Sequence, residues 1–379
     1  MRNNKIYIVL TVILFGLLLA IPGILLFVHP NNQVNNENRA MAEMPRLDPA
    51  KLDKFPNKFD NYVKDHFPFR SSILHFYFMY SLKNNKSPIP YVVMGKDNFL
   101  FCGMQEREVY EGKKGFSEEK MSKIVHDLAD RQAGYLQDSI RFYVVIAPTA
   151  YEIYPEYLPE YVQRTEETST DRFCRMMAEK APQVPLLYLK EKMLQHKKAG
   201  RLYLKNDNHW NYLGSEYAAE DILTLMAKDF PQLPQKIREK FTLEPYIRHE
   251  GNLHNMLAVN MTLEQFAQDT EYHVHYIDSA LYDIHEIYNK KYTPIPDFSY
   301  PWDYERRFST NRTQQPKIVV IRDSFGGYLM PFLSPWFRES VFIFDKWKYG
   351  ANDSIIQQEK PDIVLLMIYE PYLHSISVQ

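Results

Sequence analysis

The chain has 379 residues, of which 45% are hydrophobic, and its 45 Lys and Arg against 47 Asp and Glu give a formal net charge of −2. This length and composition are typical of a globular protein with one large domain or two ordinary ones. The basic residues are scattered along the chain. Because phosphate binding needs a concentrated basic surface, the sequence argues against a nucleic-acid partner.

The N-terminus carries an apolar segment. Residues 6–28 have no charged side chain and are mostly apolar, which is long enough to cross a hydrocarbon core of about 30 Å. Arg2 and Lys5 precede them, so the positive-inside rule predicts a cytoplasmic N-terminus and an extracytoplasmic main chain. A cleaved signal peptide is the alternative, although no small-x-small cleavage site ends the apolar run. The sequence favours an uncleaved signal anchor, with residues 1–30 as cytoplasmic stub and transmembrane segment.

Two segments separate this span from the main domain. Residues 31–38 are polar and rich in asparagine, which predicts a short flexible tether. Phe55, Phe59 and Tyr62 then recur at helical spacing and predict a packing helix. We therefore expect residues 31–90 to form a tether and an N-terminal helical segment, and residues 91–379 to form the main domain.

Strands and helices alternate from residue 91 onwards. A hairpin is predicted over 91–103, and Ser117 is the expected N-cap of a helix that runs to about residue 139. The apolar run 142–147 is typical of a strand buried on both faces of a parallel sheet. This alternation predicts an α/β fold with a flavodoxin-like parallel sheet, helices on its faces and right-handed crossovers. The later expected strands are 184–189, 201–204, 318–321, 341–344 and 363–368, and the expected helices are 171–180, 190–198, 215–228 and 325–337.

Residues 241–315 break this alternation. Their short period-2 runs and proline-rich stretches predict an insertion of a few β-strands and long loops on the rim of the sheet. His273 and His275 face one side of a probable strand and invite a metal hypothesis, but no third ligand has a clear spacing, so we predict no metal site. Cys102 and Cys174 are the two cysteines, and both a disulfide and two buried thiols remain open for them.

A short polar turn holds Asp207 and His209, two residues apart and followed by Trp210. A carboxylate can fix the tautomer of a histidine and stabilise its imidazolium, as a general base for a serine nucleophile requires. A solvated loop is the commoner explanation of an isolated Asp-x-His pair. Trp210 either packs behind the pair or offers a platform for a sugar ring.

A second turn, about a hundred residues later, contains Ser324 directly after the apolar run 318–321. Sites in parallel α/β sheets form outside the carboxyl ends of the strands, and Asp207, His209 and Ser324 each follow a predicted strand. We therefore predict a triad in which Ser324 attacks an acyl carbonyl, His209 takes its proton and Asp207 orients the imidazole. The alternative is that Ser324 only caps the helix that follows.

The neighbours of Ser324 supply candidate oxyanion or substrate-binding groups. Gly326 and Gly327 would let a substrate approach the backbone closely, and the N–H of Ser324 at a helix N-terminus would stabilise developing negative charge. Arg322 could crowd the oxyanion side or bind an anionic glycan, and both alternatives stay open. Asp323 is expected to have a structural role in the turn. Trp210 completes this set of candidates.

The segment Arg322-Asp323-Ser324-Phe325 resembles the first block of the SGNH hydrolase superfamily, in which glycine stands where this chain has Arg322. Asp207-Asn208-His209-Trp210, placed upstream of the serine, is similar to the box of the alginate O-acetyltransferase branch and of the bacterial DHHW family, where His or Thr often stands at the position of Asn208. The resemblance covers most of the chain, because further boxes follow in the expected order. They are the apolar span, Glu37-Asn38-Arg39, His66-Phe67-Pro68-Phe69-Arg70, Gly95-Lys96-Asp97 with Phe99-Leu100-Phe101, and Tyr154-Pro155-Glu156.

This resemblance implies an SGNH-hydrolase-like fold and a membrane-anchored or periplasmic O-acetyltransferase of extracellular polysaccharide, alginate or another exopolysaccharide, that works through an acyl-serine. It implies a polysaccharide acceptor and an acyl group supplied across the membrane by a membrane-bound O-acyltransferase partner. We predict no cofactor. A carbohydrate esterase would use the same triad with water in place of the sugar hydroxyl. A non-catalytic scaffold of an exopolysaccharide assembly complex is the third interpretation, for which 28 Tyr, 23 Phe and 4 Trp offer stacking surfaces.

Overall fold

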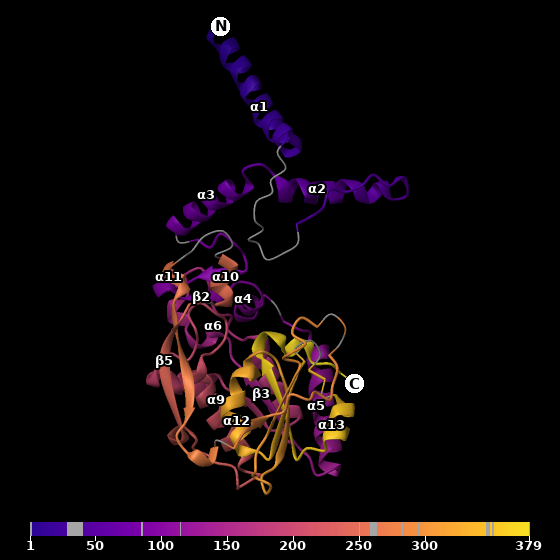
Figure 1. Ribbon diagram of the computed structural model, residues 1–379, viewed down its shortest axis with the longest axis vertical. Coiled ribbons are helices and arrows are strands. Elements are labelled where there is room, and N and C mark those ends of the chain that lie inside the picture. The colour runs from indigo at the N-terminus through magenta and orange to yellow at the C-terminus, as the bar shows by residue number, and fades with distance from the viewer. Residues whose placement is uncertain are drawn as a thin grey trace. The chain divides into compact units, whose positions relative to one another are not determined.

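The computed structural model describes residues 2–378 apart from 29–40, 85, 114, 250, 258–263, 282, 295, 297, 346–348 and 351. The chain divides into two compact units, Met1–Ile89 with Leu257–Thr262 and Pro90–Met256 with Leu263–Gln379 (Figure 1). The tether predicted at 31–38 and the Glu37-Asn38-Arg39 box lie outside the described residues.

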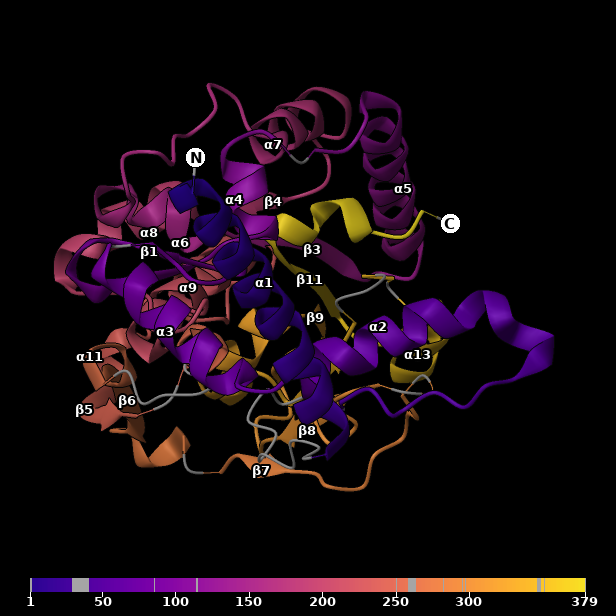
Figure 2. The same cartoon turned by 90° about the horizontal axis from the view of Figure 1, so that it is seen from above.

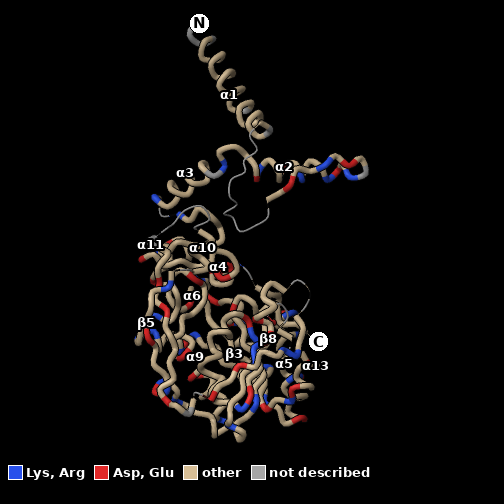
Figure 3. Tube along the Cα trace, viewed as in Figure 1, with Lys and Arg blue, Asp and Glu red and all other residues tan. Residues whose placement is uncertain are grey.

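The described secondary structure of the first unit is helical. Helix α1 (Arg2–Val28) contains a stretch, Ile6–Leu26, with a mean hydropathy of 2.8 and no charged side chain (Figure 3). By length and composition α1 fits a membrane span, and a signal sequence passes the same test. The predicted packing helix is confirmed as α2 (Phe55–His66), on which Phe55 stacks on Phe59 with ring centroids 5.8 Å apart. Helix α3 (Arg70–Lys83) follows and has no counterpart among the predicted elements.

The second unit is built around one mixed sheet of seven strands, counted over the described residues, in the order β4-β3-β11-β9-β10-β8-β7. Five neighbouring strands are parallel, as predicted. The runs of Val, Ile and Leu in four of them are buried on both faces, whereas β4, at the edge, is half-buried. The parallel strands are β4 (Leu186–Tyr188), β3 (Arg141–Ala147), β11 (Ile363–Tyr369), β9 (Lys317–Arg322) and β10 (Glu339–Phe344).

Alternate residues of these strands feed two hydrophobic clusters. On β3, Tyr143 and Val145 join the cluster on one face, which also contains side chains of α9 (Tyr212–Met226). Phe142 and Val144 join the other, with side chains of α5 (Glu118–Gln137), α7 (Ser169–Lys180) and α13 (Asp353–Glu359). Figures 1 and 2 show α5 and α9 on opposite sides of the sheet. The predicted α/β architecture with helices on both faces is confirmed.

The predicted insertion forms a separate hairpin and also adds two strands to the main sheet. Strands β5 (Phe241–Arg248) and β6 (Asp269–Tyr276) form a separate antiparallel hairpin, as the period-2 pattern suggested. Strands β7 (His285–Glu286) and β8 (Glu305–Ser309) instead extend the main sheet beyond β10, both antiparallel. The sheet is therefore mixed, where an all-parallel sheet was expected.

Two other expectations were wrong in detail. Residues 201–204 do not form a strand of the sheet, and only an isolated bridge joins Tyr203 to Trp210. The helix expected over 325–337 is a 3₁₀ turn (Phe325–Leu329), then α12 (Met330–Leu333), then a second 3₁₀ turn (Ser334–Trp336). The remaining described strands form the hairpin of β1 (Val92–Met94) and β2 (Leu100–Cys102), and the remaining described α-helices are α4 (Gln105–Tyr110), α6 (Ala150–Ile153), α8 (Lys190–His196), α10 (Asn252–Leu257) and α11 (Glu264–Ala267).

Candidate active site

Ser324 lies two residues beyond the carboxyl end of β9, which runs between β11 and β10 in the middle of the sheet. Its side chain is exposed, and it forms no capping hydrogen bond to the turn that follows. Instead, Ser324 Oγ lies 2.7 Å from His209 Nε2. The capping interpretation of this serine is therefore wrong, and its hydroxyl is free to face solvent and the imidazole together.

A tight loop presents His209. The bridge between Tyr203 and Trp210 closes it, and the N–H of Leu204 donates to the carbonyl of His209. Below the loop, Asn211 caps α9 by accepting a hydrogen bond from the N–H of Gly214. The loop is thus held by backbone pairing at one end and by a helix cap at the other, which fixes the position of the imidazole without a sheet strand.

The two nitrogens of His209 have different partners. Nδ1 lies 2.7 Å from Asp207 Oδ1, while Nε2 faces Ser324 Oγ. The side chain of Asp207 is 1% exposed and that of His209 is 11% exposed. A proton on Nδ1 satisfies the carboxylate and leaves Nε2 as the acceptor of the serine proton. The structure therefore brings together Asp207, His209 and Ser324, which are as much as 117 residues apart, in the order that a Ser–His–Asp triad needs.

The insertion holds the second oxygen of Asp207. Arg248 Nη2, from the end of β5, lies 3.2 Å from Oδ2, and the N–H of Asn252, from the start of α10, donates to the same oxygen at 3.1 Å. Burial raises the pKa of Asp207, but His209, Arg248 and the Asn252 N–H together outweigh it and hold this pKa well below its usual range. The carboxylate that orients the imidazole therefore stays ionised.

The sequence analysis did not predict Arg248 and Asn252 as partners of Asp207. Neither follows a strand of the parallel sheet, and neither belongs to a motif with a fixed spacing to Asp207. Arg248 lies 41 residues from Asp207 in the chain and approaches it only because the β5–β6 hairpin folds back on the loop. A sequence signal for them would require pairing information between distant positions.

We expect Arg248→Gln to lower the free energy of unfolding by about 1 kcal/mol at pH 7, since a charge-assisted hydrogen bond to a buried carboxylate is lost. Arg248 depresses the folded-state pKa of Asp207, so its contribution is present above the unfolded pKa of about 4 and is lost as the pH falls. In urea unfolding, the difference in free energy of unfolding between Arg248→Gln and the unmodified protein should therefore become smaller below about pH 4. Lys240→Gln is the control, because Lys240 donates to Asp278 at the other end of the hairpin. A difference in free energy of unfolding for Arg248→Gln that does not depend on pH would contradict the contact between Arg248 and Asp207.

Aromatic rings wall the imidazole. The ring of His209 lies 4.9 Å from that of Phe325 and 5.7 Å from that of Tyr328, centroid to centroid. Trp210 is fully buried, packs edge-on against Phe325 at 5.1 Å and donates from Nε1 to the carbonyl of Phe325. Trp210 therefore packs behind the dyad, and the alternative of a platform for a sugar is excluded by its burial.

Asp323 and Arg322 serve the turn itself. Buried Asp323 accepts hydrogen bonds from the N–H of Phe325, the hydroxyl of Tyr349 and the N–H of Tyr369, at 2.6–2.8 Å, in line with the structural role expected for it. Arg322 is fully buried, pairs in bidentate fashion with Asp303 at 2.8 and 3.0 Å and lies over the ring of Phe344. Asp303 holds both terminal nitrogens of this buried guanidinium, which corrects the expectation of an oxyanion or glycan contact.

The two glycines after Ser324 differ in what surrounds them. A Cβ on Gly326 would lie 2.6 Å from Arg322 Cβ, whereas one on Gly327 would meet nothing closer than Arg322 Nη1 at 3.6 Å. The N–H of Gly327 donates to the carbonyl of Ser324 within the turn. Gly326 is therefore needed for close packing on Arg322, and the half-buried Gly327 remains the candidate for contact with a substrate.

We expect Gly326→Ala to destabilise the protein by about 1–3 kcal/mol, because the added methyl group forces buried backbone or Arg322 to shift. Gly327→Ala is the matched control and should change the midpoint of thermal unfolding little, since its methyl group has ordinary contact distances. Equal decreases in the midpoint of thermal unfolding for the two variants would show that packing against Arg322 is not what requires glycine at position 326.

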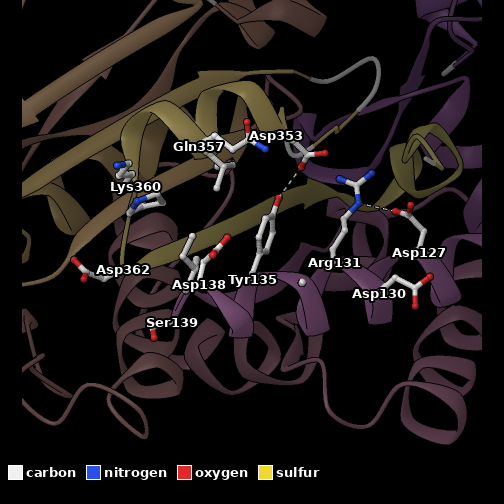
Figure 4. Close-up of a pocket in the computed structure, with 14 residues that line it drawn as sticks. Asp127, Asp130, Arg131, Tyr135, Asp138, Ser139, Asp353, Gln357, Lys360 and Asp362 are labelled. Carbon is white, nitrogen blue, oxygen red and sulfur yellow. Dashed lines mark hydrogen bonds and ion pairs between the residues drawn. The ribbon is translucent and has the colours of Figure 1, made fainter.

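Other groups of chemical interest lie elsewhere. Cys102 and Cys174 are free thiols, so the disulfide alternative is not realised. Among the described residues, no cluster of three or more metal-ligating side chains occurs, and His275 pairs with Glu244 across the exposed hairpin. A groove of ≈ 860 Å³ lies between α5 and α13 (Figure 4), where Arg131 is bound to Asp127 and Tyr135 to Asp353. None of its lining residues belongs to the triad.

Comparisons with known proteins point in one direction. Residues 92–281, half of the chain, match the model of a family described as "SGNH hydrolase-like domain, acetyltransferase AlgX". The matched range includes Asp207 and His209 and ends before Ser324. No curated protein gives a significant match.

Three solved structures are similar to this chain. PatB1 of Bacillus cereus is 15% identical, with 76% of this chain and 98% of that chain covered and a TM-score of 0.54. The O-acetyltransferase domain of Pseudomonas putida AlgJ is 19% identical over 76% of this chain and 94% of that chain, with a TM-score of 0.49. A DHHW family protein from Eubacterium siraeum is 16% identical over 76% and 100%, with a TM-score of 0.48. The likeness to PatB1 shows a shared fold, and the matching family describes its domain as SGNH hydrolase-like.

Proposed function

We propose that this chain, which belongs to the family of SGNH hydrolase-like domains described as acetyltransferase AlgX, transfers acetyl groups through Ser324, His209 and Asp207. One observation carries the proposal: the exposed hydroxyl of Ser324 lies 2.7 Å from an imidazole whose other nitrogen is 2.7 Å from a buried carboxylate. A scaffold that only bound glycan would have no need of this continuous alignment.

The reaction follows from these contacts. Ser324 Oγ attacks the carbonyl carbon of an acetyl donor while its proton passes to His209 Nε2. The imidazolium, stabilised by Asp207, returns this proton to the departing group of the donor, and an acetyl ester on Ser324 remains. An acceptor hydroxyl then loses its proton to Nε2 and attacks the ester. The tetrahedral intermediate collapses, the acetyl group leaves on the acceptor, and Ser324 Oγ regains its proton.

The acceptor that we propose is a hydroxyl group of an extracellular or periplasmic polysaccharide, with the chain anchored in the membrane by α1. The description of the matching family names an acetyltransferase, which supports acetyl as the group transferred. The apolar stretch Ile6–Leu26 after Arg2 and Lys5 supports an anchor whose catalytic unit is extracytoplasmic. We further propose that a membrane-bound O-acyltransferase partner supplies the acyl group from the cytoplasmic side.

The test is partitioning of the acyl-enzyme. The full-length protein in detergent is given a chromogenic acetyl ester, with and without a soluble oligosaccharide. Transfer predicts an acetylated oligosaccharide by mass spectrometry and faster release of chromophore when the acceptor is present. Free acetate with no acetylated sugar would assign the site to an esterase, because water reaches the exposed Ser324 as well. No turnover and no acetylated Ser324 in peptide maps would favour the scaffold.

A further inference from the structure

Helix α3 is apolar on two sides, and only one of them is covered. At 100° per residue, Leu74, Phe78 and Ser81 share one side, where Phe78 is 8% exposed. Phe69, at the N-cap, and Ile73, Phe76, Tyr77 and Tyr80, along the helix, form a second stripe that adjoins the first, at spacings of three and four residues, and each is at least 50% exposed. A helix that is hydrophobic all round requires an apolar environment on both sides. The stripe of these five residues therefore needs a partner.

Charge narrows the choice of partner. From His66 to Lys96 the sequence contains no Asp or Glu, while Arg70, Lys83 and Lys86 lie in or just beyond α3. Figure 3 shows blue at both ends of α3 and no red along it. Exposed aromatic and aliphatic side chains beside purely basic charge fit the surface of an anionic bilayer, which attracts Lys and Arg.

The length and aromatic content of α3 fit the same environment. Fourteen residues extend about 21 Å, which is too short to cross a hydrocarbon core of about 30 Å. Four of the five stripe residues are Phe or Tyr that are half exposed or more, namely Phe69, Phe76, Tyr77 and Tyr80. Tyrosine and other amphipathic rings concentrate at the level of the lipid headgroups. Such a helix lies along the membrane surface.

We infer that α3 rests in the headgroup region of an anionic bilayer, with the stripe Phe69, Ile73, Phe76, Tyr77 and Tyr80 facing the lipid. The inference rests on the membrane location proposed above and adds a second contact to that of α1. This second contact would hold residues 69–80 at the bilayer surface. With α1 as the single anchor, α3 would be separated from the membrane span by the 41 residues between Val28 and Arg70.

The experiment uses the full-length chain, with Cys102 and Cys174 changed to Ala, in vesicles of phosphatidylethanolamine and phosphatidylglycerol. Single cysteines carry a spin label at Phe76 or Tyr80 on the stripe, and at exposed His75 of the same helix but outside the stripe. Labels at F76C and Y80C should collide more with oxygen than with a water-soluble nickel chelate, and the label at H75C should show the reverse. Equal access of the chelate to the labels at positions 75, 76 and 80 would overturn the inference.

Two further readouts separate the causes of failure. A label at L14C reports on α1. Lipid contact at position 14 without lipid contact at position 76 overturns only the inference on α3. Exposure of both labels to water refutes the membrane location itself. Dipolar broadening between labels at F76C, which means that a second copy of the chain covers the stripe, also overturns a lipid partner. Esterase turnover of each labelled protein should stay within about twofold of the cysteine-free parent, because none of these positions belongs to the triad.

Discussion

Ser324→Ala is expected to lower the turnover of acetyl ester by roughly 10⁴- to 10⁶-fold, because Ser324 supplies the hydroxyl aligned with His209 Nε2 and the triad acts as a unit. The variant should fold normally. Ser324 is exposed, makes no capping hydrogen bond and has a helical backbone that alanine adopts without strain, so the cost in stability should stay below about 1 kcal/mol.

The measurement is burst and steady-state hydrolysis of a chromogenic acetyl ester, together with a peptide map for acetylated Ser324. Ser354→Ala, at an exposed serine of α13, is the control and should be indistinguishable from the unmodified protein. Thermal unfolding of both variants separates lost chemistry from lost structure. A Ser324→Ala protein that keeps a tenth of the original turnover would remove Ser324 from the mechanism.

The position of Ser324 was predictable because it depends on local pattern. The run 318–321 is apolar enough to be a central strand, and a parallel strand delivers the residues that follow it to the functional edge of the sheet. The Asp207–His209 contact was predictable for a similar reason, since two residues of separation in a turn allow a carboxylate to reach an imidazole. These inferences needed no knowledge of distant contacts.

Where prediction failed, the contacts were distant or the local pattern was misleading. Residues 201–204 look like a strand, but they pair only through Tyr203 with the loop that carries His209 itself. Arg322 looks like a ligand-binding group beside Ser324. It is buried because Asp303, from the insertion, meets it with both carboxylate oxygens. The sequence around Arg322 and that around Asp303 contain no pattern that predicts this ion pair.

Asp207→Asn is the second large effect that we expect, a fall in kcat of roughly 10⁴-fold. Asparagine keeps the size of the side chain. It removes the negative charge that stabilises the imidazolium and can place an amide N–H against His209 Nδ1, which favours the wrong tautomer. Arg248 and the Asn252 N–H would also lose their anionic partner, so a decrease in stability of about 1–3 kcal/mol should accompany the kinetic effect.

The kinetic signature distinguishes an orienting carboxylate from a substrate-binding one. Because the side chain of Asp207 is 1% exposed, it cannot touch the acetyl donor or the sugar, and KM should change less than about threefold while kcat falls. The matched control is Asp221→Asn, which breaks another carboxylate–imidazole contact, 2.8 Å from His196 Nε2, outside the triad. That variant should retain full turnover. A rise in KM with unchanged kcat in Asp207→Asn would mean that this carboxylate binds substrate, and the role of His209 as the base would then lose its structural support.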